Sequence, residues 1–176
     1  METGRGSLFE RRVKHWYDKD HETPLERVAE LAAILAVSLM TLYFIYSQLL
    51  RTGFFTPSFG STEIFLFYAP VPLGIAVSVI RMVTGRRNPA RPLETLNAIT
   101  MAAAGLWLLI VFPFNFAHLG DLLPSPLQVL LSWIPNYLGK IILLVVGLAG
   151  LFNSVYTPII YFPVRREYSR QTSSVS

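Results

Sequence analysis

The sequence predicts an all-α integral membrane protein, a bundle of four transmembrane helices. Only 15% of its 176 residues are charged, whereas roughly 25% are charged in an ordinary soluble domain. The apolar residues, 52% of the chain, gather in runs of the roughly 20 residues that a helix needs to cross the ~30 Å hydrocarbon core of a bilayer. These runs are apolar on every face, whereas the strands of a β-barrel alternate, so helices are the predicted spanning structure.

Four stretches are predicted to span the membrane: residues 31–50, 64–83, 98–117 and 141–162. The chain divides around them into an N-terminal segment, a membrane domain and a tail, residues 1–23, 24–163 and 164–176. Thr23 and Glu26 flank Pro24 at the spacing of a capping box, which predicts that the first helix begins at about residue 24. Prolines are expected to bend or interrupt the membrane helices at positions 70, 72, 113 and 158.

The positions of Lys and Arg predict the orientation of the spans. Of the 15 basic residues, 13 lie before the first span, around the connection between the second and third spans, or in the tail; the other two are Arg51 and Lys140. Short segments rich in Lys and Arg remain in the cytoplasm. We therefore expect a multi-pass protein of the cell membrane, with both termini and the connection between the second and third spans in the cytoplasm.

Two segments outside the spans are predicted to lie at the membrane surface. In residues 1–23, Phe9, Val13 and Trp16 recur at helical spacing among basic residues, which is typical of an amphipathic helix on anionic headgroups. A helix that packs on a partner is the alternative interpretation. Residues 127–134 are apolar but too short to span, and they predict a short interfacial or re-entrant helix on the outer side.

Polar residues inside the spans are few and uncharged at mid-depth, where an ionisable group costs at least ~2.5 kcal/mol and is usually functional. The candidates for an intramembrane polar contact are Ser38, Ser78, Asn153 and Ser154. Such residues usually join helices by modest hydrogen bonds. Glu30 and Arg81 share a predicted depth at the cytoplasmic edge, where they form an ion pair or reach the water independently.

The sequence predicts no catalytic, metal-binding or cofactor site, and no nucleic-acid partner. The chain has no cysteine, and it contains none of the motifs of serine hydrolases, zinc proteases or phosphate-binding loops. His118 and Asp121 provide only two ligands, fewer than a metal ion needs. The acidic and histidine residues between His15 and Glu22 are interpreted as a solvated helix face.

These observations predict a non-enzymatic accessory, scaffold or interaction subunit that acts through a basic cytoplasmic face. The side chains expected to contact anionic lipid headgroups are Arg11, Arg12, Arg86, Arg87, Arg165 and Arg166. Small residues four apart, such as Gly150 and Ser154, are compatible with a homo-oligomer or another membrane protein as partner. The alternative is a small channel or transporter component whose pore is lined by the uncharged polar residues of the spans.

Overall fold

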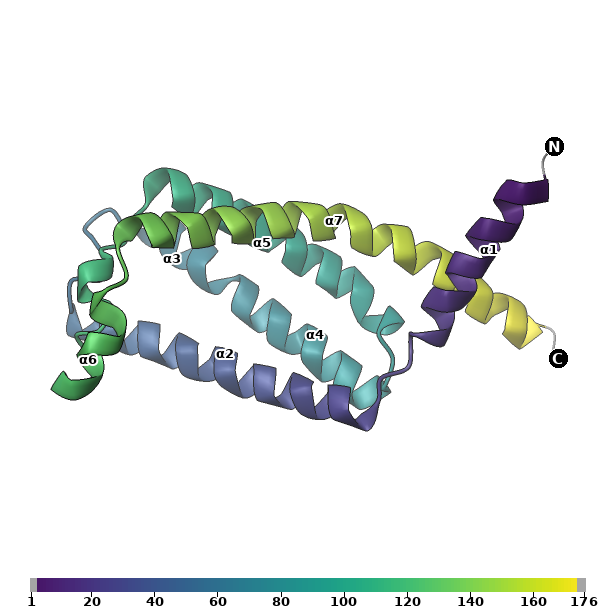
Figure 1. The fold of residues 1–176 in the computed structure, drawn as a ribbon, viewed down its shortest axis with the longest axis horizontal. Helices are drawn as coiled ribbons and strands as arrows, with labels where there is room; N and C mark the ends of the chain where they lie inside the picture. The colour runs from purple at the N-terminus through teal and green to yellow at the C-terminus, as the bar shows by residue number, and fades with distance from the viewer. Residues whose placement is uncertain (1–2, 174–176) are drawn as a thin grey trace.

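The structure, a computed structural model, is all-helical over the residues that it describes (Figure 1). It describes the backbone of residues 3–173 and the side chains of residues 11–169. The α-helices are α1 (Thr3–Asp18), α2 (Pro24–Leu50), α3 (Ser61–Tyr68), α4 (Pro70–Thr84), α5 (Arg91–Val111), α6 (Ser125–Ser132) and α7 (Asn136–Ser173). Two short 3-10 turns are η1 (Asn88–Ala90) and η2 (Phe116–His118).

Four helical segments are long and apolar enough to cross a membrane: Pro24–Leu50, Ser61–Thr84, Asn88–Val111 and Asn136–Ser169. This confirms the all-α fold class and the four predicted membrane-length helices. The start of α2 follows from its capping box, in which Thr23 Oγ1 accepts from the Glu26 amide and the Glu26 carboxylate accepts from the Thr23 amide. The cap therefore starts the helix ahead of the apolar run 31–50.

The third membrane helix differs from its predicted span, residues 98–117. α5 begins at Arg91 and ends at Val111. Phe112 follows as the C-cap with a φ of 40°, in the left-handed region. The helix ends here because the ring of Pro113 disfavours helical backbone in the residue before it. Residues 112–115 then run beside the loop after α2, where the Asn115 amide donates to the Phe54 carbonyl at 2.7 Å. The apolar run that predicted the span therefore continues beyond the end of α5.

Prolines interrupt one membrane helix and leave another continuous. α3 passes into α4 at Ala69 and Pro70, because a proline has no amide hydrogen to donate. α7 continues through Pro158 and Pro163 for 38 residues, about 57 Å at ~1.5 Å per residue. This length exceeds the ~30 Å hydrocarbon core. The tail, residues 164–176, is therefore a helical extension of α7 as far as Ser173, and its last three residues lie outside the described part.

The ends of the bundle differ in composition, and we name them accordingly. The basic end carries both termini, the start of α2 and the connection from α4 to α5; the far end carries α6 and the loop between α2 and α3 (Figure 1). α1 packs against the part of α7 at the basic end, and Val13 of α1 is buried there. Phe9 lies outside the residues whose side chains are described.

α5 and α7 form the most closely packed helix pair. A Cβ atom on Gly105 would lie 2.6 Å from the Gly147 amide nitrogen, and one on Gly150 would lie 2.5 Å from the Ala102 amide nitrogen. These backbones touch because no side chain stands between them, as is usual for tight helix pairs in membranes. α5 and α7 are thus the rigid centre on which the other helices are arranged.

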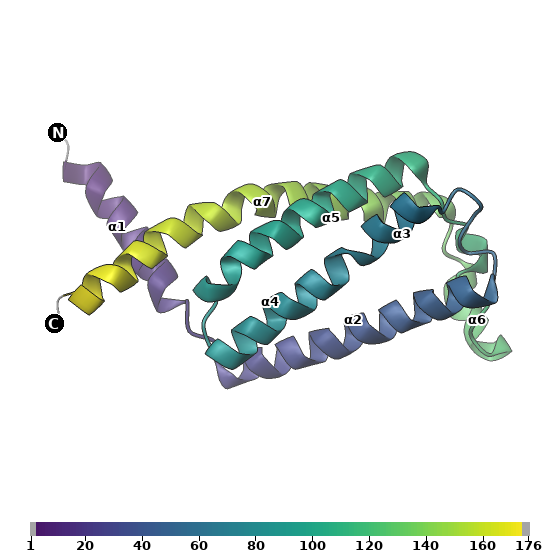
Figure 2. The same cartoon turned by 180° about the vertical axis from the view of Figure 1, so that it is seen from behind.

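α2 is the most loosely attached membrane helix. It packs mainly against α4, and it diverges from α3 and α5 toward the far end (Figures 1 and 2). The far end is closed instead by packed phenylalanines around the buried Phe54 and Phe114. Phe44 joins α2 to this cluster, with its ring centroid 5.4 Å from that of Phe54. Tyr43 adds a hydrogen bond from its hydroxyl to the Leu119 carbonyl.

We expect Gly150→Ala to destabilise the protein by about 1–3 kcal/mol, because the added methyl group forces α5 and α7 apart. Gly74→Ala is the matched control, since its Cβ would meet its nearest neighbour, Asn97 Nδ2, at an ordinary 3.5 Å. Unfolding of both variants in detergent micelles measures the difference. Equal stability of the two variants would contradict direct backbone contact between α5 and α7.

Candidate functional site

The candidate site lies at the basic end, where the linker between α1 and α2 runs antiparallel to the connection between α4 and α5. The Glu22 amide donates to the Gly85 carbonyl at 3.0 Å, and the Arg87 amide donates to the Asp20 carbonyl at 3.0 Å. Gly85 supplies the turn with a φ of 62°, a conformation that glycine adopts readily. This pairing brings the acidic linker onto the basic connection.

Asp20 is the buried centre of this site, with 0% of its surface exposed. One carboxylate oxygen accepts from the Asn88 amide at 2.7 Å, and the other accepts from the Tyr168 hydroxyl at 2.7 Å. A guanidinium nitrogen of Arg91 lies 3.9 Å away. A buried carboxylate requires such partners, so Asp20 fastens the linker, η1, the start of α5 and the end of α7 to one another.

Arg81 forms a second group of charges with two glutamates. Its guanidinium lies 2.9 Å from Glu30 and 2.7 Å from Glu94, and the Ser78 hydroxyl also donates to Glu30. The structure therefore brings Glu30 and Arg81 together, as the ion-pair interpretation of the sequence requires. It adds Glu94 of α5, so that one arginine on α4 joins α2 to α5.

Arg87 forms the third group, between the linker and the start of α2. Its guanidinium donates to Glu26 at 2.6 Å, and its Nε lies 3.8 Å from a Glu22 oxygen. Burial raises the pKa of the Glu22 carboxyl, as does the nearby charge of Glu30, while Arg81 and Arg87 oppose this rise. Glu22 is the least compensated carboxylate of the site, since its second oxygen has no hydrogen-bond partner among the described side chains.

The six arginines predicted to contact lipid have different environments. Arg87 is only partly exposed and pairs with Glu22 and Glu26, whereas the other five are exposed. Arg86 lies over the ring of Tyr168 at 5.2 Å, and Arg165 donates to the Tyr161 hydroxyl at 2.6 Å. Neither contact neutralises the charge. Five arginines, Arg11, Arg12, Arg86, Arg165 and Arg166, therefore present positive charge on the outside of the basic end.

The predicted intramembrane polar residues do not converge. Asn153 is exposed on the outer face of α7 and donates to the Ala149 carbonyl of its own helix at 2.9 Å. Ser154 likewise bonds within α7, to Leu151. The Ser78 hydroxyl donates to Glu30, and Ser38 lies on α2, away from α7. The four side chains thus line no common pathway within the described chain.

His118 and Asp121, which were too few to predict a metal site, contact each other. His118 Nδ1 lies 2.8 Å from Asp121. Within residues 11–169, no three His, Cys, Asp or Glu side chains are grouped so that they could hold a metal ion. The acidic segment read as a solvated face is partly buried instead, because Asp20 and Glu22 turn onto the arginines of the opposite connection.

Sequence reasoning missed several polar partners. The spacing of Asp20 and Arg91 gives no sign that they meet, because they are far apart in the sequence, as is Asn88, which lies 68 residues from Asp20. The pairing of Glu94 with Arg81 was missed as well. Glu63 was also missed at the far end, where it is buried, accepts from the Trp107 indole at 2.9 Å and caps α3 through the Gly60 amide. The signal that could have found Glu63 is its N3 position after a glycine.

Comparison of the chain with protein-family models, with curated proteins and with solved structures gives no match. The arrangement of residues described above is therefore the basis for assigning a function.

We expect Glu30→Ala and Arg81→Ala to be coupled in a double-mutant cycle. Each change alone removes one partner of a partly buried charge, so the double variant should lose less stability than the sum of the single losses, by about 1 kcal/mol. Unfolding in detergent measures each corner of the cycle. Arg165→Ala is the control partner, because its losses should add to those of Glu30→Ala within about 0.5 kcal/mol. Strict additivity for Glu30 and Arg81 would contradict a stabilising pair.

Proposed function

We propose that this chain is a non-enzymatic, multi-pass protein of the cell membrane, which serves as an accessory or interaction subunit by binding anionic lipid headgroups at its basic end. The observation that carries the proposal is the separation of charge at that end. The acidic side chains Asp20, Glu22, Glu26, Glu30 and Glu94 lie against Arg81, Arg87 and Arg91 of the same chain. The charge of the exposed arginines is left available to an external anion.

The orientation that this function requires is cytoplasmic for the basic end. The 13 basic residues of the flanking segments support it, against two at the far end, because positively charged short segments remain in the cytoplasm. The cytoplasmic leaflet carries the anionic lipids, which attract Lys and Arg near the surface by about 1 kcal/mol each. The protein's charge and the leaflet's charge are then complementary.

The packing of α1 supports a position at headgroup level. α1 contacts the extension of α7, with the rings of Tyr17 and Tyr168 4.7 Å apart. This contact holds Arg11 and Arg12 on the same extramembrane part of the protein as Arg165 and Arg166. The amphipathic α1 is therefore a fixed arm, and its basic face adds to the basic face of α7 in one binding surface.

A protein partner within the membrane is supported by Asn153. Its side chain is exposed on α7 among Phe152, Val155 and Tyr156, which are also exposed. The amide donates to the Ala149 carbonyl of its own helix, and an amide has further hydrogen-bonding capacity that lipid does not satisfy. Polar side chains of this kind bond across helices in membranes. We propose this face of α7 as the contact with a second copy or another membrane protein.

Single-cysteine labelling tests the orientation, because the natural chain has no cysteine. Ser58→Cys lies in the exposed loop at the far end, and Ser169→Cys is exposed at the basic end. A membrane-impermeant maleimide should label Ser58→Cys in intact cells and Ser169→Cys only after permeabilisation. The reverse pattern would overturn the cytoplasmic assignment of the basic end.

Lipid enrichment tests the binding surface. The fourfold variant R11Q/R12Q/R165Q/R166Q should retain at least about fivefold less phosphatidylglycerol than the natural chain after purification from mixed phosphatidylcholine and phosphatidylglycerol vesicles. This lower limit is the loss expected from a single arginine that contributes about 1 kcal/mol near the membrane surface. The matched control R11K/R12K/R165K/R166K keeps the charge and should keep the enrichment. Equal enrichment in the natural chain and the glutamine variant would contradict the proposed function.

A further inference from the structure

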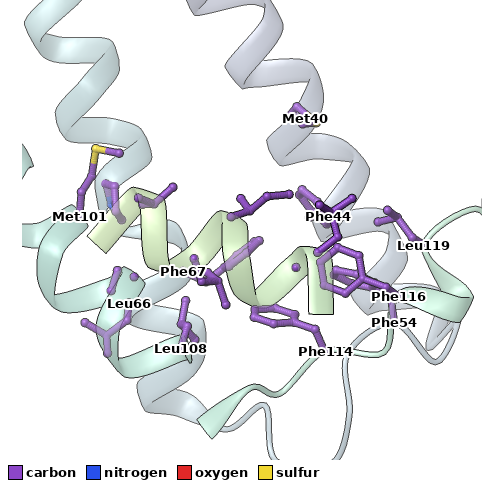
Figure 3. A pocket seen from close by; sticks show the side chains of 18 of the residues that line it. Met40, Phe44, Phe54, Leu66, Phe67, Met101, Leu108, Phe114, Phe116 and Leu119 are labelled. Carbon is purple, nitrogen blue, oxygen red and sulfur yellow. The ribbon is translucent and has the colours of Figure 1, made fainter. Parts of the chain in front are cut away.

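The far end contains an apolar cavity of about 430 Å³ between α2, α3, α5 and α7 (Figure 3). Met40 and Phe44 of α2 form one wall, and Phe67 of α3 and Met101 of α5 lie opposite. Phe114 and Phe116 close it at the end of the bundle. The cavity lies where α2, which packs against α4, separates from α3 and α5 toward the far end (Figures 1 and 2).

The lining of this cavity selects for hydrocarbon. Every residue that lines it is apolar, from Met40 on α2 to Val146 on α7. A ligand with a buried carbonyl, hydroxyl or charge would leave that group without a hydrogen bond, which is costly in an apolar site. Quinone rings, sugars and amino acids are excluded by this chemistry, and an unsubstituted alkyl chain fits it.

The volume is large enough for such a chain. An apolar cavity of about 150 Å³ already binds benzene, and ligand sites commonly measure about 300–1,000 Å³. Along α7 the lining extends from Leu138 to Val146, about 12 Å at ~1.5 Å per residue. This length is close to half of the ~30 Å hydrocarbon core, which is the depth that the acyl chains of one leaflet occupy.

A cation stands at the outer end of the cavity. Lys140 follows the lining residues Leu138 and Gly139, is exposed, and places its Nζ 4.9 Å over the Phe112 ring. No acidic side chain lies within ion-pair distance of Lys140 among the described residues. The charge complements the phosphate of a lipid whose chain enters beside it, since a long lysine side chain reaches the headgroup level.

We propose that this cavity binds one acyl chain of a membrane phospholipid, which enters laterally between α2 and α7, with Lys140 pairing with the lipid phosphate. The lining is an apolar slot of about one leaflet's depth, and Lys140 follows its outermost α7 residues, Leu138 and Gly139. A phospholipid has the same order of apolar chain and charged headgroup. The site is separate from the basic end and does not depend on the function proposed for that end.

Native mass spectrometry of the detergent-purified full chain tests the proposal, with dioleoyl phosphatidylcholine as the probe. This lipid has no net charge, so the arginines of the basic end do not select it. We expect one retained lipid per chain. Retention should be at least about tenfold lower in Ala104→Phe, because the new ring takes up space in the cavity that the acyl chain needs. Ala103→Phe is the control: Ala103 is exposed, whereas the neighbouring Ala104 is buried and lines the cavity.

A second pair of variants keeps the test decisive if Ala104→Phe does not fold. Met40→Trp fills the cavity from the loosely packed α2, and Leu39→Trp places the same ring on the adjacent exposed position. Lipid retention should fall in Met40→Trp and should not fall in Leu39→Trp. Lys140→Gln should weaken retention of the phospholipid several-fold.

Three results would overturn the proposal. The first is equal lipid retention in the cavity-filling variants and their controls. The second is retention of oleic acid in place of the phospholipid. The third is a lipid-free dimer that Met40→Trp dissociates, which would show that a second copy of the chain fills the cavity.

Discussion

The exclusion of charge from the bilayer core determines how this chain is built. Its 15 basic and 11 acidic side chains cannot lie at mid-depth without partners, so they gather at the ends of the helices. At the basic end they are close enough to neutralise one another, and Asp20 is buried only because Asn88, Tyr168 and Arg91 surround it. The network joins four segments that the membrane spans alone would leave separate.

Different interactions close the two ends of the bundle. The linker before α2 pairs with the connection after α4 through backbone hydrogen bonds and ion pairs. At the far end, the loop after α2 pairs with the segment after α5 in a similar way, through Thr56 and Pro113, but phenylalanine rings replace the charges. Several phenylalanines of this cluster, among them Phe44, Phe54 and Phe114, also line the apolar cavity.

The sequence was sufficient for the fold class and the number of membrane helices, because the length of an apolar run is a local property. The capping box of Thr23 and Glu26 was readable for the same reason. The charge network could not be predicted from the sequence, because the partners of Asp20 lie in η1, α5 and α7, and only the packed bundle brings them together. The end of α5 was misplaced because Phe112 is apolar in lipid and in an aromatic cluster alike.

The structure of α2 links the two ends physically. It is one helix of 27 residues without an internal break, and at its start Glu26 and Glu30 are held by Arg87 and Arg81. Near its other end it is held by the Tyr43 hydroxyl and by the packing of Phe44. A single unbroken helix therefore takes part in both closures, through ion pairs at the basic end and through aromatic contacts at the far end. The charge network holds the beginning of α2, and the phenylalanine cluster holds its end, so the bundle is closed at both ends by contacts of the same helix.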